Sequence, residues 1–256
     1  MNLIIFSHSD YSVLWPILEE SIENIQDINK VFVCNKTDLI KPKGFQKYIE
    51  YDDKKCYSKR WIEDILHIDK SYVLIIHDVQ VIVNCDTKYI LEIVELMEEN
   101  NIDRCSLNVF NGKEIIGKNN VNLCNLNTAK GLTFTPYDTC PSIWKTKSFI
   151  KLWETFPNET YGSSELNANL QEFCKHNLKC FGLQKNNERI YYCLGRPFLK
   201  EFKILLITIK NEITFPKNVY MDMETEFTYY FEKYNLCEKI KINNNYGFVL
   251  NNFNKL

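Results

Sequence analysis

The sequence lacks the short motifs by which the commonest nucleotide-binding and metal-binding folds are recognised. With only 8 glycines in 256 residues, it contains neither the GxGxxG pattern of dinucleotide-binding folds nor the GxxxxGKS or GxxxxGKT pattern of P-loop NTPases. No CxxC pair is present, which disfavours a zinc ribbon. The chain has 4 histidines and one His-Asp dipeptide, His77-Asp78, and a metal-dependent hydrolase or phosphatase would need further His and Asp ligands.

Long apolar runs and an excess of one charge are also missing. The apolar run at 204–209 is too short to span a bilayer, and the N-terminal run at 3–6 is too short for a signal peptide. The formal net charge is -2, whereas dedicated nucleic-acid binders carry a concentrated basic face. We therefore expect a cytoplasmic protein with no transmembrane segment and no nucleic-acid partner.

The 10 cysteines indicate free thiols rather than a disulfide framework. A thiol inside an apolar run behaves as a small hydrophobic side chain. Five of the cysteines lie in or beside such runs: Cys34, Cys85, Cys105, Cys174 and Cys193. We expect reduced, structural thiols in a reducing compartment.

Apolar residues alternate between short continuous runs and helical spacing, which is the rhythm of β-α-β units. The pattern predicts strands at 3–6, 31–34, 48–51, 72–76, 104–110, 180–183 and 190–194. It predicts helices at 13–25, from near Ser58 to 68, at 86–97 with Asp86 and Thr87 as caps, at 143–153 and at 164–176. After residue 111 the periodicity weakens, and an aromatic segment at 227–234 lies near the end. We expect one α/β domain over residues 1–256, parallel in its first half and irregular in its second.

Polar segments follow three of the predicted strands directly, at 7–10, 35–38 and 77–80. Ligands of open α/β sheets bind beyond the carboxyl ends of the strands. These three segments are therefore the predicted binding site. An acidic and hydroxyl-rich edge without a glycine fingerprint disfavours a dehydrogenase or a P-loop enzyme.

The order of several motifs resembles the GT-A glycosyltransferases, particularly small single-domain enzymes of bacterial surface polysaccharide synthesis and of large DNA viruses. The motifs are Ser7-His8-Ser9-Asp10, Ser58-Lys59-Arg60-Trp61, the strand that ends at His77-Asp78, Pro141-Ser142-Ile143-Trp144-Lys145, and a helix start around Glu165. The resemblance covers residues 1–185. It implies a Rossmann-like mixed central sheet flanked by helices, with an irregular C-terminal half. Residues 1–110 would form the nucleotide-sugar half, and 111–256 the acceptor half with an extension. A viral member would work in the host cytoplasm.

The resemblance also implies roles for individual residues. In such enzymes an acidic motif at the strand end contacts the ribose and holds a divalent cation that stabilises the diphosphate leaving group. Here Asp78 has His77 beside it and one of the usual carboxylates is missing, so binding of Mn2+ or Mg2+ by these two residues is expected to be weak or dispensable. The remaining donor-site candidates are Ser7, His8, Asp10, Asn35, Ser58, Arg60 and Trp144, with Lys59 and Arg196 as further cations for the diphosphate.

Transfer with inversion requires a carboxylate that takes a proton from the acceptor hydroxyl. The resemblance places this base at Glu165, in the first turn of a helix capped by Ser163 or Ser164, with Asp138 in reserve. A first-turn glutamate is also an ordinary partner of the helix dipole. Trp144 is either a wall for a sugar ring or core packing, and the pair Asp52-Asp53, in a lysine-flanked loop, is interpreted as solvated.

The sequence therefore predicts an inverting hexosyl- or deoxyhexosyltransferase. Its donor would be a nucleotide-diphospho-sugar, and its acceptor a glycan or a protein-linked acceptor. The alternative is a catalytically inactive relative that serves as a binding or scaffold protein, since one acid beside Asp78 is missing.

Overall fold

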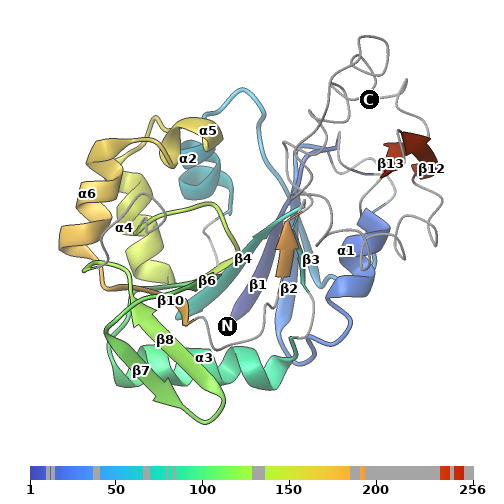
Figure 1. The fold of residues 1–256 in the computed structure, drawn as a ribbon. Coiled ribbons are helices and arrows are strands. Elements are labelled where there is room, and N and C mark those ends of the chain that lie inside the picture. The colour runs from blue at the N-terminus through green and yellow to red at the C-terminus, as the bar shows by residue number, and fades with distance from the viewer. Residues whose placement is uncertain are drawn as a thin grey trace.

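The computed structural model describes residues 1–9, 12, 15–36, 41–65, 70–78, 80–82, 85–128, 136–184, 191–193, 237–242 and 245–250. These residues build a nine-stranded mixed sheet in the order β3-β2-β1-β4-β9-β6-β10-β8-β7, with helices on both of its faces (Figure 1). The expected class, an α/β fold with a mixed central sheet flanked by helices, is confirmed. Asp10, His67, Arg196 and the segments 204–209 and 227–234 lie outside the described residues.

The first half of the sheet is parallel, as expected. β1 (Asn2–Phe6) pairs with β2 (Asn29–Cys34) on one side and with β4 (Tyr72–His77) on the other, and β2 pairs with β3 (Lys47–Glu50). All residues of β1 and β4 are buried. This explains why both strands are uninterrupted apolar runs, since a central parallel strand is covered on both faces.

The second half of the sheet contains a strand in a segment that the sequence pattern predicted to be helical. β9 (Ser142–Lys145) lies antiparallel between β4 and β6 (Arg104–Phe110), and only then does α4 (Thr146–Thr155) begin. The predicted helix over 143–153 was therefore wrong in its first turn. The short apolar run Ile143-Trp144 is compatible with a strand or a buried helix, and only its pairing decides. β10 (Cys180–Gln184) runs parallel to β6, and the hairpin of β7 (Ile115–Lys118) and β8 (Val121–Asn125) closes this edge.

The helix predicted at 164–176 is two helices. α5 (Tyr161–Ser164) is capped by Thr160, whose side chain accepts a hydrogen bond from Ser163 N in a capping box. α6 (Ala168–Asn177) restarts at Asn167, which accepts from two backbone N–H groups of the new helix. Neither Ser163 nor Ser164 is the helix cap, so the predicted cap was wrong.

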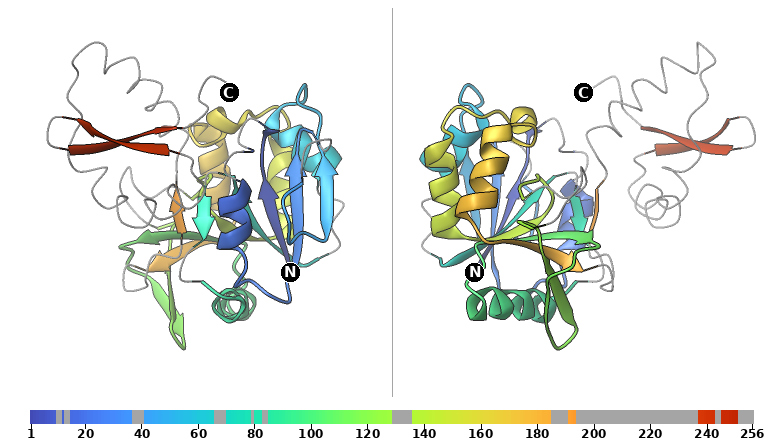
Figure 2. Two further views of the ribbon diagram at one scale, coloured as in Figure 1. Left: turned by 90° about the vertical axis from the view of Figure 1, so that its right-hand side faces the viewer. Right: turned by 60° about the vertical axis from the view of Figure 1, so that its left-hand side comes forward.

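The helices divide between two apolar clusters, one on each face of the sheet (Figure 2). α1 (Trp15–Ser21) and α3 (Thr87–Glu99) supply residues to one cluster. α2 (Tyr57–Lys59), the following π-helix Arg60–Ile65, α4 and α6 supply residues to the other. Asp86 caps α3 by accepting from Tyr89 N at 2.8 Å, as predicted.

Two smaller sheets complete the described elements. β5 (Gln80–Ile82) pairs with β11 (Tyr191–Cys193), and β12 (Cys237–Ile242) pairs with β13 (Asn245–Leu250). Eight cysteines of the described chain are free thiols, and six of these are buried. No helix among the described residues has the length and apolar character needed to cross a membrane.

Candidate functional site

The candidate site lies at the carboxyl edge of the parallel strands, where the strand order reverses. From β1 the chain moves outward through β2 and β3 and then returns to the other side of β1 as β4. Such a switch point opens a crevice at the strand ends, because the connections leave in opposite directions. Phe6 and His77 face each other in register across β1 and β4, so the residues after them meet at this point.

Asp78 is held at this edge by the segment that follows β1. Its N–H extends the ladder to Phe6 O at 3.1 Å, and its Oδ2 accepts hydrogen bonds from Ser7 Oγ and His8 N, both at 3.0 Å. Trp15 Nε1 in turn donates to Ser7 Oγ at 2.8 Å. Asp78 and Ser7 are both buried, with 4% and 1% of their surface exposed. The carboxylate therefore serves first to fix the β1 loop.

A second carboxylate, Asp53, lies beside the first and faces the solvent. Asn35 Nδ2 donates to Asp53 Oδ2 at 2.6 Å, and His8 Nε2 lies 3.2 Å from the same oxygen. Arg60 Nη2 donates to Asp53 O at 2.7 Å and approaches Oδ1 at 3.5 Å. Asp53 is exposed in its loop, as expected of a solvated residue, and in addition its hydrogen bonds join residues from the ends of β1, β2 and β3.

Arg60 is held against the end of β3 and is not a free cation. Its guanidinium lies over the Tyr51 ring, 4.7 Å from the centroid, and its Nε donates to Lys55 O at 2.9 Å. Tyr51 Oη donates to Ser7 O at 3.0 Å, and burial raises the pKa of Tyr51 well above its ordinary value. Arg60 thus contributes to the cluster through Asp53 rather than as the predicted open diphosphate contact.

Ser58 and Lys59, the two residues that precede Arg60, lie apart from the cluster. Ser58 is fully buried, and its Oγ accepts from Glu159 N at 3.0 Å. This contact joins α2 to the segment before α5, so the predicted role of Ser58 in donor binding is not supported. Lys59 is exposed.

His77 and Asp78 contact different surroundings, because successive side chains along a strand point to opposite faces. His77 Nε2 lies 3.0 Å from Tyr57 Oη, and its ring contacts Phe6 and Tyr161 with centroids 5.8 and 4.9 Å apart. Within the described part of the chain, no group of three or more His, Cys, Asp or Glu is arranged to hold a metal ion. The expected metal pair of His77 and Asp78 therefore does not fit a shared cation.

Glu165 is linked to the tip of β4 through Thr139. Glu165 Oε1 accepts from both Thr139 N and Thr139 Oγ1 at 2.5 Å, and Gln80 Nε2 donates to Thr139 O at 2.8 Å. Tyr161, whose ring packs on His77, donates from Oη to Thr139 Oγ1 at 3.2 Å. Glu165 is exposed and ends α5, so its expected place in a first helical turn was wrong.

Asp138 is half-buried and paired with a buried arginine, so it is not positioned as an open base. Arg104, which is fully buried, donates from Nη2 to Asp138 Oδ1 at 2.5 Å. Ser106 Oγ and Cys140 N also donate to this carboxylate. Burial lowers the pKa of Arg104, but the combined interactions with Asp138, Cys180, Cys174 and Tyr137 raise it, so that the pKa lies above its ordinary value. The reserve prediction of Asp138 as the catalytic carboxylate is therefore corrected.

Trp144 belongs to the core, so the alternative of a sugar-stacking wall is excluded for it. Only 1% of its surface is exposed, and its ring lies 5.1 Å from that of Phe149 between centroids. Its Nε1 donates to Ser142 Oγ at 2.9 Å.

The structure thus brings together Ser7, His8, Asn35, Arg60 and Asp78 among the predicted residues and adds Tyr51 and Asp53. One signal for Asp53 was present, because it follows the predicted strand at 48–51. The strand-end rule that selected the other three segments selects it as well.

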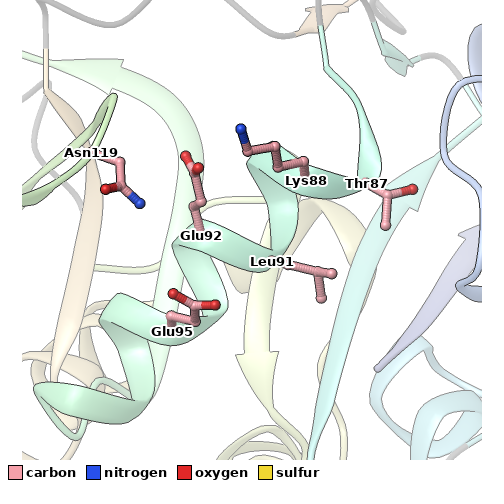
Figure 3. Close-up of a pocket in the computed structure, with 6 residues that line it drawn as sticks. All are labelled: Thr87, Lys88, Leu91, Glu92, Glu95 and Asn119. Carbon is pink, nitrogen blue, oxygen red and sulfur yellow. The ribbon is translucent and has the colours of Figure 1, made fainter.

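Two surface depressions lie elsewhere, on α3. One of about 400 Å³ is lined by Thr87, Lys88, Leu91, Glu92, Glu95 and Asn119 (Figure 3). A neighbouring one of about 690 Å³ shares Lys88 and Glu92. Neither includes any residue of the strand-end cluster. The first is lined mainly by the exposed face of α3, and the second by α3 and the neighbouring loop residues Asn24, Gln26 and Asn120. We therefore assign the site by chemistry and topology rather than by concavity.

The sequence matches no protein-family model and no curated protein. Among solved structures, residues 1–349 of S. aureus TarS are 12% identical, with 84% of this chain and 67% of that chain covered at a TM-score of 0.48. The same fragment in complex with UDP is 11% identical over 91% and 78% of the two chains, with a TM-score of 0.47. The glycosyltransferase GlyE of Streptococcus pneumoniae TIGR4 is 10% identical over 82% and 50%, with a TM-score of 0.37.

Proposed function

We propose that this chain is a glycosyltransferase that binds a nucleoside-diphosphate sugar at the carboxyl edge of β1, β2, β3 and β4. The observation that carries the proposal is the connected polar cluster of Ser7, His8, Asn35, Asp53 and Asp78 at the strand-order reversal. Open α/β sheets bind their ligands at such a place. The acceptor would be a hydroxyl of a glycan or of a protein-linked glycan.

Glu165 is the proposed base for an inverting transfer. Its carboxylate is exposed and fixed by two hydrogen bonds from Thr139, which leave Oε2 able to accept a proton from an acceptor hydroxyl. The acceptor oxygen would form the new bond to the anomeric carbon while the bond to the diphosphate breaks. Since His77 and Asp78 do not form a shared cation site, we propose that dependence on Mn2+ or Mg2+ is weak or dispensable.

Nucleotide binding is the first test. Thermal unfolding would be followed with UDP, GDP and dTDP, each with and without Mn2+. A nucleotide present at 100 times its Kd stabilises the folded state by about 2.7 kcal/mol, which raises the Tm of a chain of this size by roughly 5–10 °C. No shift with any of the three nucleotides would contradict the proposal.

Turnover is the second test, with Glu165→Gln compared with Glu172→Gln. Glu172 is an exposed carboxylate on α6 that pairs with His176 and Lys175, so its replacement controls for the loss of one surface charge. We expect Glu165→Gln to lose most donor hydrolysis while it binds nucleotide normally, and Glu172→Gln to keep both. Nucleotide binding by the unchanged chain without any turnover would support an inactive binding protein instead.

A further inference from the structure

We infer that the two carboxylates of the cluster have different tasks: Asp53 recognises the nucleoside half of the donor, and Asp78 is a positioning residue for the β1 loop. This inference rests on the proposed function, since it assumes that a nucleotide binds at this edge. It assigns the exposed carboxylate, from the end of β3, to the role that the resemblance gave to the strand-end aspartate of β4.

Asp78 is directed into the protein. It is buried, and its Oδ2 receives hydrogen bonds from Ser7 Oγ and His8 N. Ser7 is itself anchored by Trp15 Nε1, and its carbonyl accepts from Tyr51 Oη. A carboxylate that satisfies buried donors in this way loses them if it turns to a ligand, and unsatisfied buried donors are costly. Its contacts are those of a loop anchor.

Asp53 is directed outward and is held in place from several sides. Its side chain is 45% exposed, and its Oδ2 accepts from Asn35 and lies within hydrogen-bond distance of His8 Nε2. Arg60 gives its 2.7 Å hydrogen bond to the backbone oxygen of Asp53 and stays 3.5 Å from Oδ1. An ionised carboxylate has room for about four hydrogen bonds. Oδ1 therefore retains capacity for a donor group supplied by a ligand.

The chemistry of this oxygen selects the part of the ligand that it meets. A carboxylate only accepts hydrogen bonds and repels a diphosphate. The donors in a nucleoside-diphosphate sugar are O–H groups of the ribose and of the sugar and N–H groups of the base, and we assign Asp53 to those of the nucleoside, which the sugar-free nucleotides below test. Because Asn35, His8 and Arg60 fix the side chain before binding, little rotamer entropy is lost when the ligand arrives.

The test compares Asp53→Asn with Asp52→Asn by calorimetric titration of UDP, GDP, dTDP and inorganic pyrophosphate. Asp52 is the adjacent exposed carboxylate, whose Oδ1 accepts from Lys54 N. For Asp53→Asn we expect the affinity for the best-bound nucleotide to fall about tenfold to a hundredfold, as for loss of a hydrogen bond to a charged group. Pyrophosphate binding should stay the same or tighten, because a repelling charge is removed. Asp52→Asn should change the affinities for the nucleotide and for pyrophosphate only slightly, and both in the same direction.

Nucleotide analogues separate the ribose from the base. The best-bound nucleotide would be compared with its 2′-deoxy, 3′-deoxy and N-methylated base forms. If Asp53 contacts one of these groups, the losses of binding free energy from removing that group and from replacing Asp53 are not additive. Additive losses with every analogue would overturn the inference.

The positioning role of Asp78 is tested by comparing Asp78→Asn with Asp78→Ala. Asparagine keeps an oxygen that can accept from Ser7 and His8, whereas alanine does not. We expect Asp78→Asn to retain nucleotide affinity within about threefold and Asp78→Ala to lose it together with thermal stability. A loss in Asp78→Asn as large as that in Asp53→Asn would overturn the division of roles.

The outcomes distinguish this inference from the proposed function. If the unchanged chain binds no nucleotide, both are overturned. If it binds a nucleotide and Asp53→Asn binds it equally well, the inference alone is overturned and the proposed function stands.

Discussion

Replacing Asp138 by asparagine tests whether this residue stabilises the fold or takes part in catalysis. The substitution keeps the shape of the side chain but removes the charge that faces Arg104. Arg104 is fully buried, and its guanidinium also donates to Pro136 O at 2.7 Å and lies over the rings of Tyr137 and Trp144. The change therefore leaves a buried cation without its counter-charge.

The expected cost follows from this geometry. Removing one partner of a buried ion pair destabilises a protein by about 3–5 kcal/mol, because the remaining charge stays desolvated. For a chain of this length each kcal/mol lowers the Tm by roughly 2–4 °C. Asp138→Asn should therefore melt about 6–20 °C below the unchanged protein, in thermal scans and with a matching fall in the urea midpoint. Glu165→Gln, which changes an exposed carboxylate, should melt within about 2 °C of it.

A double substitution provides the control. The double variant Arg104→Met with Asp138→Leu carries neither charge. Replacing a buried ion pair by well-packed apolar side chains often leaves the stability of a protein unchanged. The double variant should recover a large part of the stability that Asp138→Asn loses. An Asp138→Asn protein that melts like the unchanged one but has lost turnover would refute this reasoning and return Asp138 to the catalytic site.

Three further outcomes are expected. Gly182→Ala should cost about 1–3 kcal/mol and lower the Tm, because a Cβ there meets the Phe110 ring at 2.3 Å; an unchanged Tm would contradict this packing. Gly162→Ala, in α5 with nothing within 4 Å of its Cβ, should instead stabilise by about 0.5–1 kcal/mol in the same thermal scans. Burial raises the pKa of the Cys34 thiol to about 11, so roughly one molecule in a thousand carries the thiolate at pH 8. Alkylation mapped by mass spectrometry should therefore label the half-exposed Cys56 long before Cys34, and equal rates would refute the burial of Cys34.

The strands β1, β2 and β4 could be predicted because each contains a run of residues buried on both faces and so reads as a continuous apolar run. β1, β2 and β4 all appear where the pattern places them. β9 could not be predicted, since its apolar residues run directly into the periodic residues of α4 and only pairing with β4 and β6 distinguishes the two elements. The break between α5 and α6 depends on side-chain caps at Thr160 and Asn167, which periodicity does not detect.

The sequence predicted that the three polar segments meet at one edge of the sheet, but not which side chains join them there; their role in ligand binding stays a prediction. The strand-end rule selected the segments that contain Ser7, Asn35 and Asp78, and the structure brings them together. The sequence alone could not exclude Asp138 and Trp144 from the candidate site, because the role of an acidic or aromatic residue is shown only by its burial and its partners. Arg104 lies 34 residues from Asp138 in the chain, and nothing local links the two.

The sequence has no second acidic residue next to Asp78, which suggested that a binding function had been lost. A site at the ends of several strands, however, does not need its two acids to be neighbours in the sequence. Neighbours along a strand point to opposite faces, whereas residues after different parallel strands meet at one edge. Asp53 and Asp78 come from the ends of β3 and β4, and His8 contacts both, through its ring and its backbone N–H. In the proposed site, one carboxylate shapes the loop and the other is available to a ligand. The degenerate motif around Asp78 therefore does not argue against the proposed donor site, because another strand supplies an exposed carboxylate.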